Sequence, residues 1–156
     1  MLNITIPGVG ELAIKHVVFD FNGTLATDGK LRPSLVPLLA QLKAKAKLYV
    51  LSADTYGSVR EECGDLGLEV RVLSSKNGAA EKRAFVRERG AETTVCVGNG
   101  VNDAGMFEIC ALSLLIMGEE GCAVKTFAKA DIIVKNSEDA LNLLLHPQRI
   151  TATLRA

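Results

Sequence analysis

The 156-residue sequence has few of the features that would place it in a membrane or on nucleic acid. Eighteen basic residues balance eighteen acidic ones, so net charge gives no argument for binding nucleic acid or an acidic membrane surface. The longest apolar runs, such as residues 111–117, are far shorter than a membrane span. The N-terminus lacks the basic start and long apolar stretch of a signal peptide. We therefore expect a cytoplasmic protein with no nucleic-acid and no membrane partner.

Cysteine and histidine are also too sparse and scattered to indicate a disulfide framework or a zinc site. The four cysteines, Cys63, Cys96, Cys110 and Cys122, form no CxxC or CxC pair. The two histidines are isolated from them and from each other. This distribution favours reduced, mostly buried thiols.

What is present is enough apolar sequence for one globular domain, because hydrophobic residues make up 48% of the chain. There is no internal repeat, low-complexity segment or linker. We expect a single domain over 1–156, with an N-terminal β-hairpin (1–15), a core (16–146) and a C-terminal tail (147–156). The hairpin follows from two short β-rich runs around Pro7-Gly8.

The core shows six alternations of β-rich runs with helical patterns. Strands are expected at 15–21, 47–53, 68–73, 93–98, 112–117 and 130–134. Helices are expected at 33–45, 54–66, 79–89, 102–110, 121–128 and 137–145, and the helix at 137–145 is expected to be the last one in the chain. The strands are apolar along their whole length, as strands covered on both faces are. This pattern predicts an α/β fold with a Rossmann-like, doubly wound parallel sheet.

In such sheets functional groups lie at the carboxyl ends of the strands. Asp20 follows the first core strand, Ser52 and Ala53 the second, and Gly98-Asn99-Gly100 the fourth, with Asp103 just inside the next helix. Lys82 lies in the helix before the fourth strand.

Each of these residues also has a structural interpretation. Asp20 can cap the following turn, Ser52 and Asp103 can cap helices, and Lys82 can be a solvated helix lysine. The chemical interpretation is that Asp20, next to the tight turn at Gly23 and Thr24, holds or attacks a phosphate, which exposed backbone N–H groups would bind. Taken residue by residue, both interpretations stay open.

Together, DFNGT (20–24), Ser52, Lys82 and GNGVND (98–103) resemble the four ordered motifs of the haloacid dehalogenase (HAD) superfamily of phosphohydrolases. The resemblance extends from about Val17 to the C-terminus. It is greatest to soluble proteins similar to the phosphorylation domain of P-type ATPases, in which GDGxND precedes a strand, a glycine turn and an A-D-I-V strand. The resemblance implies a HAD core with strand order 3-2-1-4-5-6.

The resemblance also implies roles. Asp20 would attack phosphorus and become an aspartyl phosphate. Gly23, Thr24, Ser52, Ala53 and Lys82 would bind the substrate phosphate. Mg²⁺ would be held by Asp20, Asn99, Asp103 and the backbone carbonyl of Asn22.

Two positions depart from the family pattern. Most HAD phosphatases have a second Asp where this chain has Asn22, and an amide cannot exchange a proton with a leaving group near neutral pH. The first acid of GDGxND is Asn99 here, which keeps an oxygen ligand but loses a charge. We therefore expect a slow Mg²⁺-dependent phosphohydrolase, or one that stalls as a phosphoenzyme.

Spacing leaves no room for a cap domain, because 31 residues separate Asp20 from Ser52 and 29 separate Ser52 from Lys82. The substrate is then a phosphorylated small molecule or macromolecule at an open site, with residues 26–30 as the candidate flap. A homo-oligomer through the open active-site face or the C-terminal segment would supply a wall. One alternative is a catalytically impaired HAD domain that binds a phospho-ligand or a protein. Another is a domain similar to a response-regulator receiver, but the order of DFNGT and GNGVND argues against it.

Overall fold

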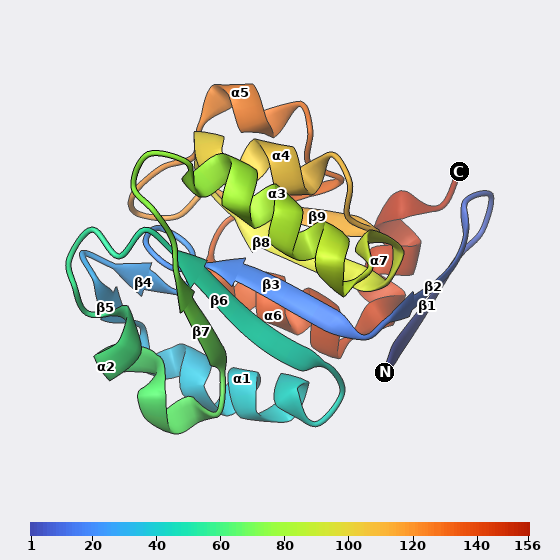
Figure 1. Cartoon of the computed structure of the whole chain (residues 1–156). Coiled ribbons are helices and arrows are strands. Elements are labelled where there is room, and N and C mark those ends of the chain that lie inside the picture. Colours follow the sequence, from blue (N-terminus) through green and yellow to red (C-terminus); the bar gives the residue numbers. More distant parts are fainter.

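The structure, a computed structural model, describes all 156 residues. Its centre is a sheet of six parallel strands (Figure 1). In sheet order they are β10 (Ile132–Val134), β9 (Leu112–Ile116), β8 (Thr94–Gly98), β3 (His16–Asp20), β6 (Lys47–Ser52) and β7 (Glu69–Val72). Numbered along the chain this is the order 3-2-1-4-5-6, so the predicted doubly wound α/β fold is confirmed.

Helices cover both faces of this sheet (Figure 1). On one face lie α1 (Val36–Lys43) and α6 (Ser137–Leu145), and on the other α3 (Gly78–Arg89) and α4 (Ala104–Phe107). Two further short helices, α2 (Val59–Cys63) and α5 (Val124–Phe127), lie at the periphery. Four 3-10 helices, Pro33–Leu35, Gly64–Leu66, Ala91–Thr93 and Val101–Asp103, adjoin them.

The central strand β3 is buried on both faces. Val17 and Phe19 belong to the larger apolar cluster, on the α1 and α6 side, whereas Val18 belongs to the smaller one with Phe85 of α3. Alternate residues of a strand point to opposite faces, so a strand between two helix layers needs apolar residues at every position. Burial of each such side chain contributes roughly 1.5–3 kcal/mol. Packing from both sides therefore fixes the end of β3, where Asp20 lies.

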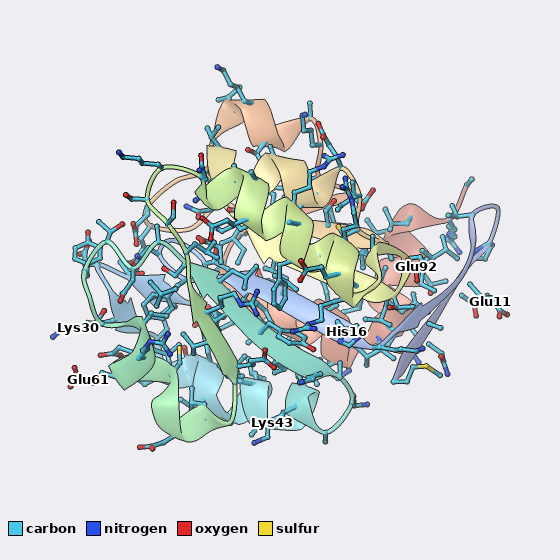
Figure 2. All side chains as sticks on the ribbon, viewed as in Figure 1. Glu11, His16, Lys30, Lys43, Glu61 and Glu92 are labelled. Carbon is cyan, nitrogen blue, oxygen red and sulfur yellow. The ribbon has the colours of Figure 1, made fainter.

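Charged side chains lie around the outside of this core. Figure 2 labels Glu11, Lys30, Lys43, Glu61 and Glu92, all exposed and all at the periphery of the molecule. None of the helices combines the length and the apolar character that a membrane span requires.

The N-terminal hairpin is formed by β1 (Leu2–Ile6) and β2 (Gly10–Ile14), as predicted. The segment expected to be a C-terminal tail instead forms α7 (Pro147–Leu154), so α6 is not the last helix. Pro147 suits the first turn of a helix, and Ile150 becomes fully buried in the larger cluster. Thr151 Oγ1 also donates to the carbonyl of Thr5 at 2.8 Å, which fastens α7 to β1.

Several predicted helices are shorter in the structure; α5, for example, spans only Val124–Phe127 of the predicted 121–128. Two of the differences have a visible cause. The helix expected from residue 54 begins at Val59, because Asp54 has a left-handed φ of 55° and its Oδ1 accepts from the backbone N–H of Val59 at 3.0 Å. The predicted helix 102–110 is a 3-10 turn followed by the short α4. Both differences lie at the carboxyl ends of strands, where side chains bind the backbone of the loop.

Candidate active site

Asp20 is the last residue of β3, at the centre of the sheet, and is only 8% exposed. The chain then turns tightly, because the backbone N–H groups of Thr24, Leu25 and Ala26 all donate to the carbonyl of Phe21. Gly23 has a φ of +79° within this turn, a conformation that favours glycine. The turn places Thr24 Oγ1 3.5 Å from Asp20 Oδ2.

Lys82 of α3 joins two carboxylates from different elements. Its Nζ lies 2.6 Å from Asp20 Oδ1 and 2.7 Å from Asp103 Oδ1, and its side chain is fully buried. The pKa of Asp20 is raised to about 6, because burial and the neighbouring Asp103 raise it by more than Lys82 lowers it. Burial would lower the pKa of Lys82, but the two carboxylates outweigh it and raise that pKa. The three side chains form a buried cluster with a net charge of −1.

Asp103 also organises the loop between β8 and α4. Its Oδ2 accepts from the backbone N–H groups of Asn99 and Gly100, each at 2.9 Å. Asn99 in turn donates from Nδ2 to the carbonyl of Gly121 at 3.0 Å and accepts from Thr24 Oγ1 at 3.4 Å. The loop therefore contacts the turn after Asp20.

The other predicted site residues lie close by. Ser52 directly follows Leu51, the residue paired with Asp20 across β3 and β6, and its Oγ accepts from the N–H of Asp54 at 2.9 Å. Ala53 is exposed at the same edge. Asn22 has a buried Oδ1 with no hydrogen-bond partner. An orphaned buried oxygen is costly, and here it lies two residues from Asp20.

The predicted flap is a small hairpin of β4 (Ala26–Thr27) and β5 (Lys30–Leu31). Its tip is held from two sides. The N–H of Asp28 donates to Glu120 Oε2 at 3.2 Å, and the carbonyl of Gly29 accepts from Ser58 Oγ at 2.5 Å. The hairpin thus joins loops that follow β6 and β9, beside the turn that carries Gly23.

The amino-acid sequence is similar to two proteins of Methanocaldococcus jannaschii. No family model matches it. The uncharacterized protein MJ0073 of Methanocaldococcus jannaschii is 38% identical over 69 residues, which cover 44% of this chain and 74% of that protein. The chain belongs to the same family as MJ0073. The uncharacterized protein MJ0072 of the same organism is 49% identical over 39 residues, 25% of this chain and 89% of that protein.

Solved structures similar to the chain identify its fold. The cobalt-bound deoxy-D-mannose-octulosonate 8-phosphate phosphatase of Haemophilus influenzae is 16% identical, with a TM-score of 0.71 over 92% of this chain and 94% of that one. A 3-deoxy-D-manno-octulosonate 8-phosphate phosphatase of Moraxella catarrhalis, in complex with magnesium, phosphate and KDO, is 14% identical, with a TM-score of 0.70 over 90% of both chains.

A putative HAD superfamily (subfamily III A) hydrolase of Legionella pneumophila is 12% identical, with a TM-score of 0.72 over 91% of this chain and 87% of that one. The chain has the HAD fold. That part of the resemblance is confirmed, whereas the likeness to P-type ATPases stays a prediction.

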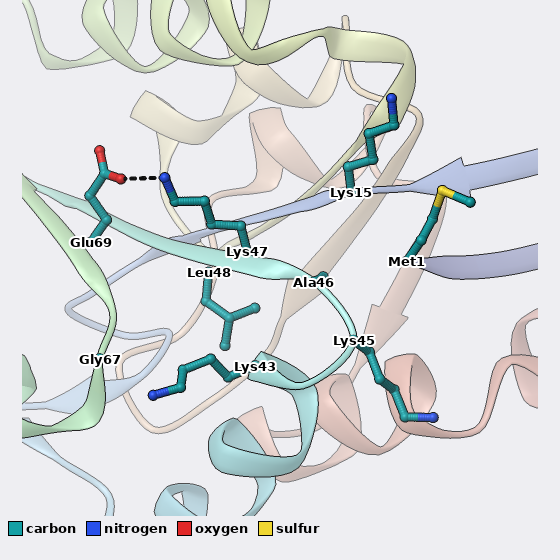
Figure 3. A pocket seen from close by; sticks show the side chains of 9 residues that line it. All are labelled: Met1, Lys15, Lys43, Lys45, Ala46, Lys47, Leu48, Gly67 and Glu69. Atoms are coloured by element: carbon teal, nitrogen blue, oxygen red, sulfur yellow. Dashed lines mark ion pairs between the residues drawn. The ribbon is translucent and has the colours of Figure 1, made fainter.

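Of two cavities in the structure, one lies beside the turn that follows Asp20 and the other lies far from it. One, of about 340 Å³, is lined by Gly23 and Thr24 of the turn after Asp20, together with Met117, Lys135 and Asn136. A larger one, of about 440 Å³, lies at the opposite end of the sheet, where Figure 3 shows lysines around the starts of β3 and β6. Only the first adjoins the candidate site.

The first cavity is also lined by residues outside the four motifs. Lys135, Asn136 and Ser137 follow β10, and Met117 follows β9. Like Asp20, these residues lie at the carboxyl ends of parallel strands, where functional groups of such sheets are found. The signal was therefore present in the sequence.

The residues around Asp20 fit a divalent cation with oxygen ligands. No three or more His, Cys, Asp and Glu side chains are grouped so that they alone could hold a metal ion. The carboxylates of Asp20 and Asp103, the backbone carbonyl of Asn22 that the resemblance implies, and the amide oxygens of Asn22 and Asn99 are nevertheless donors of the kind that Mg²⁺ prefers. The orphaned Oδ1 of Asn22 and the net charge of −1 both favour a cation here. With two acids, the donor set predicts weak binding.

Proposed function

We propose that the chain is a Mg²⁺-dependent phosphohydrolase that acts through an aspartyl phosphate at Asp20. The observation that carries this proposal is the position of Asp20, a buried carboxylate at the end of the central strand, between Lys82 and the turn at Gly23 and Thr24. Burial raises the pKa of Asp20, whereas the ammonium group of Lys82 lowers it and so favours the ionised carboxylate that attacks phosphorus.

In the first step a carboxylate oxygen of Asp20 forms a bond to phosphorus while the bond from phosphorus to the leaving oxygen breaks. Lys82 offsets negative charge on the carboxylate and the phosphoryl oxygens, and Ser52 can donate its hydroxyl to one of them. A divalent cation held by Asp20, Asp103, Asn99 and Asn22 would supply further positive charge beside the phosphoryl group. In the second step water attacks phosphorus, releasing inorganic phosphate and the Asp20 carboxylate.

Asn22 limits both steps. A second carboxylic acid at this position would protonate the leaving oxygen and then take a proton from the attacking water, and such help accelerates a reaction by roughly 10²–10⁴-fold. The amide of Asn22 does neither, so the proton must come from and return to solvent. The proposed enzyme is therefore slow. Its phosphoenzyme accumulates when the leaving group needs no protonation, as with acetyl phosphate, because only the second step then lacks the help of an acid and base.

The test is to incubate the protein with acetyl phosphate and Mg²⁺ and to follow its intact mass. We expect one added phosphoryl group in the wild type and none in Asp20→Asn. Asn22→Asp should hydrolyse the phosphoenzyme roughly 10²-fold faster or more. Asn142→Asp, which makes the same change on α6, is the matched control and should behave as the wild type.

A peptide map must precede the assay, because Asn22-Gly23 and Asn99-Gly100 are sequences prone to deamidation. Rapid turnover in the wild type that Asn22→Asp leaves unchanged would refute the slow-enzyme proposal. The absence of a phosphoenzyme and of any turnover would instead favour a domain that only binds a phosphorylated ligand or a protein. The lack of acids at Asn22 and Asn99 is what favours that second candidate.

A further inference from the structure

The cavity beside the candidate site shares a wall with the turn after Asp20. Thr24 lines the cavity, and its Oγ1 lies 3.5 Å from Asp20 Oδ2. Ser137, which also lines the cavity, donates a hydrogen bond from Oγ to the carbonyl of Thr24. The loop after β10 is therefore fastened to the loop that would hold the phosphate. A ligand whose phosphate lies at Asp20 has this cavity next to it.

Two cations line the cavity, and they differ in their partners. Arg32 is engaged, because its Nε lies 3.1 Å from Glu138 Oε1 and its Nη1 lies 3.6 Å from Glu119 Oε1. Lys135 takes part in no ion pair of the structure. The cavity thus holds one cationic group that the protein leaves without a carboxylate.

The residue after Lys135 adds a hydrogen-bond donor. Asn136 caps α6, because its Oδ1 accepts from the N–H of Asp139 at 2.8 Å. Its Nδ2 makes no hydrogen bond within the protein and is free to donate to a ligand. Lys135 and Asn136 thus bring an ammonium group and an amide N–H group to the lining of one cavity, and donors of these two kinds recognise an anionic oxygen, such as that of a carboxylate or a phosphate.

We propose that this cavity binds the part of the substrate that carries a second anionic group, with Lys135 as the specificity-determining residue. The substrate class is then a small phosphomonoester that also carries a carboxylate or a second phosphate. This proposal rests on the proposed function, since it places the substrate phosphate at Asp20. Lys135 acts on substrate choice and leaves the chemistry at phosphorus unchanged.

The experiment compares two probes that differ in one group, 3-phosphoglycerate and glycerol 3-phosphate. Binding is measured by calorimetry in the Asp20→Asn protein, which cannot form the aspartyl phosphate, with and without Lys135→Ala. We expect Lys135→Ala to weaken the binding of 3-phosphoglycerate about tenfold, the effect of losing a hydrogen bond to a charged group. The binding of glycerol 3-phosphate should stay unchanged, and Lys135→Arg should restore most of the loss.

Lys45→Ala is the matched control, because Lys45 is also an exposed lysine without an ion pair but lies at the opposite end of the sheet. It should change neither affinity. A bisphosphate probe distinguishes the second phosphate from the carboxylate as the favoured group.

Equal weakening of both probes by Lys135→Ala, no effect on either, or no binding of 3-phosphoglycerate would each overturn the proposal. Turnover by the wild type is measured separately. A protein that binds 3-phosphoglycerate through Lys135 but hydrolyses no phosphomonoester would refute the proposed function and leave the anion subsite standing.

Discussion

Lys82 Nζ lies 2.6 Å from Asp20 Oδ1, and this contact joins α3 to the end of the central strand inside the protein. Because the same ammonium group lies 2.7 Å from Asp103, it separates two carboxylates that would otherwise face each other unpaired. Buried charges that lose a partner are far more costly than surface ones. The contact therefore has consequences for stability as well as for chemistry.

Lys82→Met should lower the free energy of unfolding at pH 7.5 by roughly 3–5 kcal/mol, because it leaves two buried carboxylates without their cation. It should also raise the pKa of Asp20 further, since Lys82 is the group that lowers it. A folded-state pKa raised above the unfolded value means that stability returns as the pH falls. Urea unfolding at pH 7.5 and at pH 5 measures both effects.

The matched control is Lys76→Met, which removes an exposed lysine that forms no ion pair. It should change stability little at either pH. If the loss in Lys82→Met were the same at both pH values, the cost would come from packing, and the electrostatic account would be wrong.

Gly23→Ala should cost about 3 kcal/mol and disturb the site. The new Cβ would lie 2.2 Å from Asn99 Nδ2, and alanine would have to adopt a φ of +79°. Gly57→Ala isolates the backbone contribution, because Gly57 has a φ of +69° but no atom within 4 Å of the position that a Cβ would take. That variant should cost only about 1–2 kcal/mol.

Thermal or urea unfolding of the two glycine variants provides the comparison. The difference between them reports the contact of Gly23 with Asn99. Equal losses would show that Asn99 moves aside at no cost and that the turn and the GNGVND loop are not tightly packed.

Much of the candidate site could be predicted from the sequence, because its residues lie in short local patterns along the chain. An apolar run that ends in Asp20 predicts a buried strand with an acid at its edge, and the same holds for Ser52. The position of Asp103 near the end of a strand could be predicted because a glycine-rich loop precedes it and a helix begins beside it. Sheet order then brings these ends together without any knowledge of side-chain contacts.

What the sequence did not predict depends on long-range contacts. The helix expected from Asp54 starts late because a side chain binds a backbone N–H five residues away. Helix α7 forms because Ile150 has a place in the core beside the N-terminal hairpin, a contact between the two ends of the chain. That Lys82 is buried between two acids, and not solvated, likewise appears only when three elements are packed.

Glu138→Gln should destabilise the protein at neutral pH by about 1 kcal/mol. Burial alone would raise the pKa of Glu138, but the hydrogen bonds from Ser34, from its own backbone N–H and from Arg32 lower it. Because the pKa of Glu138 is lower in the folded state, its ionised form stabilises the protein at pH values above the pKa of the unfolded state, about 4.3. This stabilisation is lost as the pH falls through the pKa of the folded state.

Stability curves from pH 7 to pH 3 test this prediction. The wild type and Glu138→Gln should differ at pH 7 and converge in the acid range. Glu61→Gln, at an exposed residue without an ion pair, should follow the wild type throughout. A pH-independent gap between Glu138→Gln and the wild type would mean that the charge of Glu138 contributes nothing.

Asn99→Asp should lower the stability of the metal-free protein and raise its affinity for Mg²⁺. The change removes the Nδ2 donor to the carbonyl of Gly121 and sets a carboxylate against that carbonyl, at a cost of about 1 kcal/mol without metal. It also adds a third negative charge to a donor set that has two acids, which should tighten Mg²⁺ binding by about tenfold. A ligand that binds only the folded state raises the melting temperature in proportion to the logarithm of its concentration over Kd.

Melting temperatures with EDTA and with increasing MgCl₂ measure both effects, and adding EDTA should reverse the second. Asn3→Asp adds the same charge at an exposed position of the N-terminal hairpin and should match the wild type. In Asn99→Asp the curve should start lower and rise more steeply, because the carboxylate costs stability without a cation and contributes a ligand with one. If both variants responded to Mg²⁺ alike, Asn99 would not be a metal ligand, and the cation would have to be held by Asp20 and Asp103 without it.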